Sequence, residues 1–181
     1  MALTAVIGAM RSLGYRARRT FAPGPLLLTL ALVASPAWSS PPKVEVTDLT
    51  FSTTVGGTMA SVRDALTSAL EGENYMIVNT LNVQEALRNR DIAAEPIQLV
   101  EFINLTKAYS VTQSDSRFEL FAPLRAALFQ REGNVVILIL RPRFIEATLG
   151  STKLSPEARQ TLEGFDDSLK QVLETVATGG F

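Results

Sequence analysis

Cysteine and histidine are both absent from the 181 residues of this chain. Without imidazole, a single chain cannot form a Ser-His-Asp triad or a histidine-ligated zinc, copper or haem site. Without a thiol, it cannot perform cysteine catalysis, hold an iron-sulfur cluster or form a disulfide. The chemistry left to it is that of carboxylates, hydroxyls, amines and guanidinium groups. We therefore expect no cofactor and no metal site.

Acidic residues are absent from residues 1–39, which contain four arginines and the apolar run PLLLTLALVA at 25–34. A run of this length is too short to cross a bilayer as a helix, which takes about 20 residues. The small residues of SPAWSS follow it, so residues 1–39 have the pattern of a secretory signal peptide. Cleavage after Ala37 and after Ser39 fit equally well, and Arg18-Arg19 leaves both the general and the twin-arginine export routes open. We expect the mature protein to be periplasmic or secreted.

Long basic runs are also missing from the rest of the chain. Four of the 17 Lys and Arg, and none of the 18 Asp and Glu, fall in residues 1–39, so residues 40–181 carry a net charge of −5. An acidic surface is repelled by phosphate backbones and by anionic lipid. We therefore expect no nucleic-acid partner and no membrane association beyond the export signal.

After the signal peptide, residues 40–45 include the Pro41-Pro42 pair and are predicted to form an extended tether. Residues 46–181 have the length and composition of a single domain. Hydrophobic periodicity predicts its first elements. They are a strand in 44–55 with a phase slip near Asp48, a helix from Thr58, a strand at 75–78, a short helix capped by Asn82, a strand at 97–104 and a helical turn or two at 106–113.

Two further features complete the predicted fold. LRAALFQ and VVILIL, joined by REGN, predict a β-hairpin in which Gly133-Asn134 supplies positive φ values. The second of these strands is apolar on both faces, so we expect it at the centre of the sheet. Ser155-Pro156-Glu157 predicts the start of a long amphipathic C-terminal helix. This order of elements predicts an α+β two-layer sandwich, with that helix packed on one face of a mainly antiparallel sheet.

Candidate functional residues gather around the segment 104–128, where a polar turn leads into an apolar strand. Glu101 and Asp115 are weak candidates for a general acid and base, which is the basis of one interpretation, a carboxylate-dependent hydrolase or lyase. A Ser/Lys dyad of Ser110 or Ser114 with Lys107 is a further possibility without a supporting signature.

The interpretation that we favour over this alternative is a non-enzymatic binding module, in which polar residues rim an apolar cleft and recognise a small molecule or a protein. The candidate ligand-binding residues are Asn104, Gln113, Asp115 and Arg125. In the plainer alternative, Gln113 and Asp115 only cap the turn and Arg125 faces solvent. Arg141-Pro142-Arg143 could hold an anion or be a solvated strand end. A third interpretation, a structural subunit of a periplasmic assembly, predicts an exposed apolar patch of more than a few hundred Å².

The spacing of several motifs resembles the bacterial domain-of-unknown-function 302 family, whose central pattern is roughly C/G-N-P-K, Q-A-D/N-P, L-P-x-x-V and a hairpin ending in D-P. The matching positions here are Asn104, Gln113-Ser114-Asp115, Ala122-Pro123, the LRAALFQ and VVILIL hairpin, and Arg141-Pro142. The departures are Ile103, Leu105, Thr106, Leu124 and Arg141, which replace the family's small or Cys residue, Pro, Lys, second Cys and Asp. A metal or redox role for the family's cysteines therefore cannot apply to this chain. The resemblance implies a curved antiparallel sheet with helices on one side and a homodimer, and it implies no established activity.

Overall fold

The computed structural model describes residues 43–150 and 153–179. The predicted signal peptide at 1–39 and residues 40–42 of the predicted tether lie outside these residues. The described elements, in chain order, are β1 (Glu45–Val46), β2 (Thr50–Gly56), α1 (Met59–Gly72), β3 (Met76–Asn82), α2 (Val83–Arg88), β4 (Ile97–Ile103), α3 (Leu105–Ser114), the 3-10 helix η1 (Ser116–Leu120), β5 (Leu124–Arg131), β6 (Asn134–Leu140), α4 (Pro142–Leu149) and α5 (Pro156–Thr178).

The strands form one six-stranded sheet in the order β1-β2-β6-β5-β4-β3, and every neighbouring pair is antiparallel. The expected central strand, β6, lies between β2 and β5. The predicted β5–β6 hairpin is also confirmed, with a two-residue turn closed by Arg131 and Asn134. The positive φ values belong to Glu132 (52°) and Gly133 (79°), so the prediction of Gly133-Asn134 was one residue out of register.

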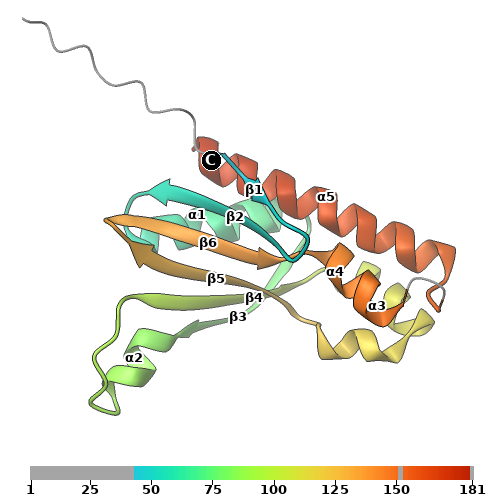
Figure 1. The fold of residues 1–181 in the computed structure, drawn as a ribbon, viewed down its shortest axis with the longest axis horizontal. Coiled ribbons are helices and arrows are strands. Elements are labelled where there is room, and N and C mark those ends of the chain that lie inside the picture. Colours follow the sequence, from blue (N-terminus) through green and yellow to red (C-terminus); the bar gives the residue numbers. More distant parts are fainter. Residues whose placement is uncertain (1–42, 151–152, 180–181) are drawn as a thin grey trace, which may run out of the picture. The chain divides into compact units, whose positions relative to one another are not determined.

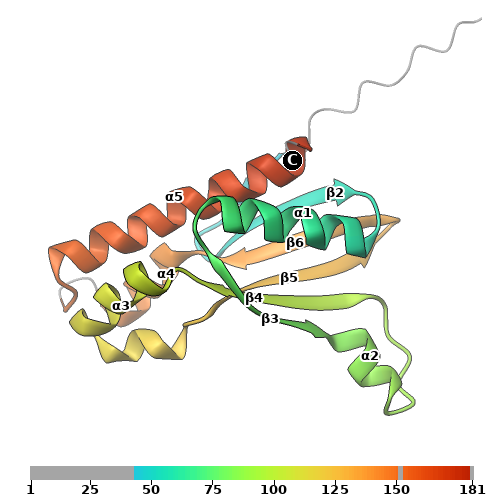
Figure 2. The ribbon, with the colours of Figure 1, turned by 180° about the vertical axis from the view of Figure 1, so that it is seen from behind.

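Helices cover one face of this sheet. Figure 2 shows α1 and α5 on the near side of the strands, and Figure 1, from the opposite side, shows the strands in front of α1. The register aligns one inward-facing side chain from each of four strands, and each is at most 1% exposed; these are Phe51, Ile139, Ala126 and Val100. Helix α5 packs against β2 on this side of the sheet, and every member of its predicted apolar stripe is buried. The predicted α+β sandwich is therefore confirmed.

Local side-chain hydrogen bonds fix where several elements begin. Ser155 Oγ accepts from the backbone N of Ala158 at 3.1 Å and caps α5, as predicted. The strand predicted with a slip near Asp48 is instead two strands, because Thr47 Oγ1 accepts from the backbone N of Thr50 at 2.9 Å and holds a turn between β1 and β2.

Two helical elements were not predicted. Helix α4 begins with Pro142 in its first turn and buries Ile145 and Leu149, whereas the sequence at its start was interpreted as a strand end. The five-residue η1 follows α3 directly and buries Phe118. None of the helices in the described part of the chain is both long enough and apolar enough to cross a membrane.

Candidate functional site

Glu101 and Arg125, two of the predicted site residues, form a cross-strand pair on β4 and β5. Arg125 Nε donates to Glu101 Oε1 at 2.8 Å, and Asn79 Nδ2 of β3 donates to Glu101 Oε2 at 3.3 Å. The hydrogen bond from Arg125, followed by that from Asn79, lowers the pKa of the Glu101 carboxyl below its usual value. Glu101 is therefore held in its ionised form.

Asp115 lies elsewhere, at the junction of α3 and η1. Its carboxylate caps η1 by accepting from the backbone N of Arg117 at 3.0 Å, and it forms an ion pair with the Arg117 guanidinium. Arg117 Nη2 also donates to the carbonyl oxygen of Leu149 at 2.8 Å, which ties η1 to α4. The hydrogen bonds from Arg117 lower the pKa of Asp115 to about 2. In the described residues, no hydrogen bond or salt bridge joins Asp115 to Glu101 or Arg125.

Asn104 and Gln113 lie at the two ends of α3. Asn104 Oδ1 caps this helix by accepting from the backbone N of Lys107 at 3.2 Å. Asn104 also lines a hollow of about 460 Å³ together with Met76, Ile103 and Leu105 among others. Gln113 is exposed in the last turn of α3. Of the predicted residues, the structure thus joins only Glu101 and Arg125 directly.

The other polar candidates have structural partners. Ser114 Oγ accepts from the backbone N of Ser155 at 2.8 Å, and Ser110 Oγ donates to the carbonyl oxygen of Lys107 at 2.8 Å. Arg141 Nη2 donates to the Asp166 carboxylate at 2.7 Å. The Arg141 guanidinium is therefore already paired with a carboxylate.

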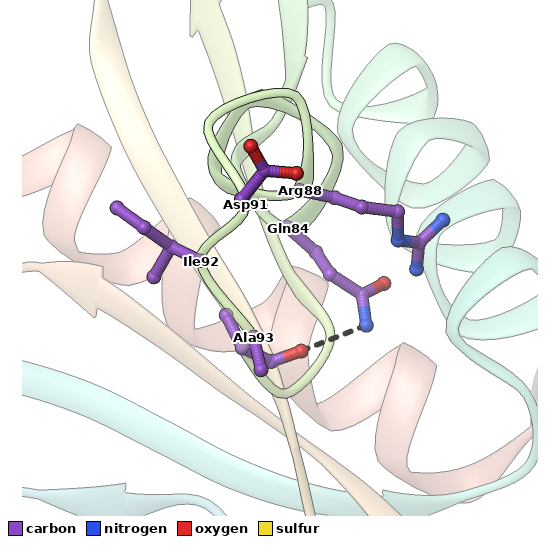
Figure 3. Close-up of a pocket in the computed structure, with 6 residues that line it drawn as sticks. Gln84, Arg88, Asp91, Ile92 and Ala93 are labelled. Atoms are coloured by element: carbon purple, nitrogen blue, oxygen red, sulfur yellow. Dashed lines mark hydrogen bonds between the residues drawn. The ribbon is translucent and has the colours of Figure 1, made fainter.

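A hollow of about 420 Å³ lies between α2 and the segment that follows it. Gln84 Nε2 donates to the carbonyl oxygen of Ala94 at 2.9 Å across this hollow. Figure 3 shows that Arg88, Asp91 and Ile92 point in three different directions. Because its side chains do not converge on one point, this hollow lacks the placed polar groups that fix a small ligand.

Seven apolar side chains lie in two rows on the side of the sheet opposite to the helices. The cross-strand register places four of them in one row and three in the next; they are Leu81, Leu99, Ala127 and Leu138, and then Ile97, Phe129 and Val136. None belongs to the core that α1, α3, α4 and α5 cover, and each is exposed or half-buried. The polar row Asn79, Glu101 and Arg125 continues this surface. We call these ten residues the open face.

A signal for the open face was present in the sequence. VVILIL is apolar at every position, and the outward positions of β4 and β5 include Ile97, Leu99 and Phe129. A sheet covered by helices on one side needs apolar residues only on that side. The predicted cleft with a polar rim was placed at the turn of residues 104–115 and did not include this second apolar face.

Carboxylates do not gather into a metal site in the described part of the chain. Within residues 43–150 and 153–179, no group of three or more Asp or Glu lies close enough together to hold a metal ion.

Comparisons with known proteins agree on one family. A family model described as "Domain of unknown function DUF302" matches residues 51–176. A solved structure described as "Crystal structure of uncharacterized conserved protein DUF302 from Bacillus stearothermophilus" is similar, with a TM-score of 0.63 and 17% sequence identity over 69% of this chain and 95% of that chain. At that identity the likeness concerns the fold. No curated protein matches the chain.

Proposed function

The chain belongs to the DUF302 family, whose description names no activity, and from this premise we propose that it is an exported, non-enzymatic module that recognises a protein through its open face. The observation that carries the proposal is the pair of apolar rows on the uncovered side of the sheet. Soluble monomers rarely expose a contiguous apolar patch of more than a few hundred Å² unless it serves an interaction.

The state of the carboxylates supports a non-enzymatic role. A carboxylate pair that performs acid-base catalysis needs pKa values pushed in opposite directions, so that one group holds a proton. Here arginine hydrogen bonds lower the pKa of both Glu101 and Asp115. A hydrolase or lyase built on these two residues therefore lacks a proton donor near neutral pH.

A protein partner fits the surface better than a small molecule does. The hollow beside α2 has side chains that diverge, whereas the open face is broad and extends over several strands. The same breadth favours a second candidate function, a subunit of a periplasmic assembly, which the exposed apolar patch would serve. Export itself is supported by the basic and then apolar composition of residues 1–39 and is tested by fractionating cells that produce the full chain.

A thiol-labelling experiment tests docking without knowledge of the partner. Because the chain has no cysteine, the single substitution Ala127→Cys places one thiol in the middle of the open face. Ser68→Cys, on the exposed side of α1, is the matched control. Reaction with a maleimide is measured in intact producing cells and in dilute purified protein.

The proposal predicts that the thiol of Ala127→Cys reacts several-fold more slowly in cells than in dilute solution, and that the thiol of Ser68→Cys reacts at the same rate in both. If the open-face thiol reacts as fast in cells as in dilute solution, the open face is not a docking surface and the proposal is wrong.

A further inference from the structure

We propose that the sheet edge at β3 binds an extended segment of another protein, which adds to the sheet as a further strand and carries an acidic residue beside Lys107. This inference goes beyond the proposed function, because it concerns the edge of the sheet rather than the open face. The observations that support it are the free edge, its lack of protection, and the lining of the hollow at its end.

Strand β3 is the last strand of the sheet and pairs only with β4. Figures 1 and 2 both show it at the border of the sheet. The backbone N–H and C=O groups that point away from β4 therefore have no strand partner in the described part of the chain. An extended peptide presents donors and acceptors with the spacing of such a row. The edge therefore suits an extended peptide better than a small molecule.

Side chains leave this edge accessible. Five of the seven residues of β3 are exposed. They include Met76, Val78 and Leu81, each with 45% to 49% of its surface exposed. Thr80 is exposed as well, although its register partner Val100 is buried beneath the helices. The helical layer therefore does not extend over this part of β3.

Strand β3 has little protection against pairing with another chain. Edge strands are usually protected by charges, prolines, bulges or extreme shortness. The opposite edge strand, β1, has only two residues, one of which is Glu45. Strand β3 has seven residues and contains neither a charged residue nor a proline. Its register shift lies between Ile77 and Asn79, so residues 79–82 keep a regular register. These residues can accept a further strand.

The hollow of about 460 Å³ at the start of β3 indicates what the bound segment carries at that end. Met76, Ile103 and Leu105 line it and suit an apolar side chain. Lys107 lines it too, and no acidic side chain within residues 43–150 and 153–179 forms a salt bridge with Lys107. Because residues 40–181 carry a net charge of −5, this ammonium group is a local site of charge complementarity for an acidic residue.

The first test is selection from a library of random short peptides displayed on phage, with the purified protein as the target. The enriched peptides should be rich in β-branched and aromatic residues and should share an acidic residue. Val78→Lys places a charge on the edge and should weaken binding of the best peptide at least about tenfold. The matched control Leu120→Lys, at a position on η1 that is 83% exposed, should bind like the unmodified protein. Circular dichroism verifies that both variants are folded.

The role of Lys107 is tested by a double substitution. Lys107→Gln should weaken binding of the selected peptide. It should have no effect on a peptide in which the acidic residue is replaced by its amide, because the charge pair is then already absent.

The second test does not depend on a protein variant. N-methyl groups on alternate backbone nitrogens keep the side chains of the selected peptide and remove the hydrogen-bond donors of one of its edges. Methylation of the edge that faces β3 should abolish binding, and methylation of the other edge should leave it unchanged. The unmodified peptide should also slow hydrogen exchange of the β3 amides.

The outcomes separate this inference from the proposed function. If no peptide is enriched, or if binding survives both Val78→Lys and each methylation pattern, the edge does not bind an extended segment. A peptide that protects the thiol of Ala127→Cys but not the β3 amides binds the open face, which overturns this inference and leaves the proposed function standing. If the β3 amides are already protected in concentrated protein alone, a second copy occupies the edge and the inference is wrong.

Discussion

Asp166 has the most enclosed carboxylate among the described residues, with 4% of its surface exposed. It accepts hydrogen bonds from Arg141 Nε and Nη2, at 3.2 and 2.7 Å, and from the backbone N of Arg143 at 3.3 Å. Arg141 also donates to the carbonyl oxygen of Thr47 at 2.7 Å. This single carboxylate therefore connects α5 to the start of α4 and, through Arg141, to the β1–β2 turn.

Removing this carboxylate should destabilise the folded protein. Asp166→Ala leaves the Arg141 guanidinium, whose side chain is only 15% exposed, without its partner. Breaking a buried ion pair on one side costs about 3–5 kcal/mol, so we expect the free energy of unfolding in urea to fall by about 3 kcal/mol. The exposed neighbour Asp167 is the matched control. Asp167→Ala should change the free energy of unfolding by less than about 0.5 kcal/mol. Equal effects of the two substitutions would show that the ion pair contributes nothing.

Asp115 gives the protein an acid-dependent component of stability. Its pKa falls from an ordinary value of 3.8 to about 2 in the folded state, because Arg117 bonds to the ionised form. The unfolded state therefore binds a proton at Asp115 more readily than the folded state does. The stabilisation that the ionised Asp115 carboxylate gives the folded state is fully present above about pH 4 and is lost as the pH falls towards about 2. Asp115→Asn should make the thermal unfolding temperature less dependent on pH in that window. If the substitution leaves the acid limb of the curve unchanged, the Asp115–Arg117 pair is not the cause.

Among single residues, whether a contact could be predicted depended on how far apart its two residues lie in the sequence. Asp115 and Arg117 are two residues apart, and a cap at this position was one interpretation of the sequence. Arg141 and Asp166 are 25 residues apart. Their pairing requires α5 to lie against the end of β6 in one register, and periodicity does not specify that register. The Arg141-Pro142-Arg143 motif was therefore interpreted as an anion site or a solvated strand end.

Among the elements, α3 depends on the Asn104 side chain that caps its first turn. Loss of an N-cap costs about 1 kcal/mol, whereas serine is as good a cap as asparagine. Asn104→Ala should therefore lower the free energy of unfolding by about 1 kcal/mol, and Asn104→Ser should leave it nearly unchanged. Asn89→Ala, in an exposed turn after α2, is the control. If Asn104→Ala is as stable as the unmodified protein, Asn104 does not act as a structural cap.

The β5–β6 turn places a residue with a side chain at positive φ. Glu132 has a φ of 52° and Gly133 a φ of 79°. Asparagine tolerates this left-handed conformation better than glutamate does, and Asn-Gly is the preferred pair in such a turn. Glu132→Asn should raise the free energy of unfolding by about 0.5 kcal/mol, and Gly133→Ala should lower it. A destabilised Glu132→Asn would indicate that the Glu132 side chain has a role of its own.

The elements that periodicity predicted are those that bury one regular stripe of side chains. Helices α1 and α5 belong to this group. Strands β5 and β6 were predicted instead from the turn that joins them. The missed elements are short and are set by neighbouring structure. Helix α4 has eight residues with three buried positions, and the β1–β2 turn depends on the Thr47 hydroxyl. Such features need the packed molecule to define them.

For the whole molecule, the fold class could be predicted from the order of the elements, but the surface that we propose to be functional could not. The site residues predicted from the sequence were polar, and in the structure these polar groups serve as helix caps and ion pairs. The open face becomes visible only when the strand register aligns side chains from β3, β4, β5 and β6 into rows. Its two uninterrupted apolar rows belong to the assembled sheet rather than to any one motif.

The most direct test of the account is the solvent accessibility of the open-face methyl groups, measured by NMR with a water-soluble paramagnetic probe. In dilute purified protein, the methyl groups of Leu99, Val136 and Leu138 should be broadened by the probe, as should those of Leu120, which is 83% exposed. The methyl groups of Ile137, which is buried under the helices, should be shielded. Open-face methyl groups as shielded as those of Ile137 would contradict the account.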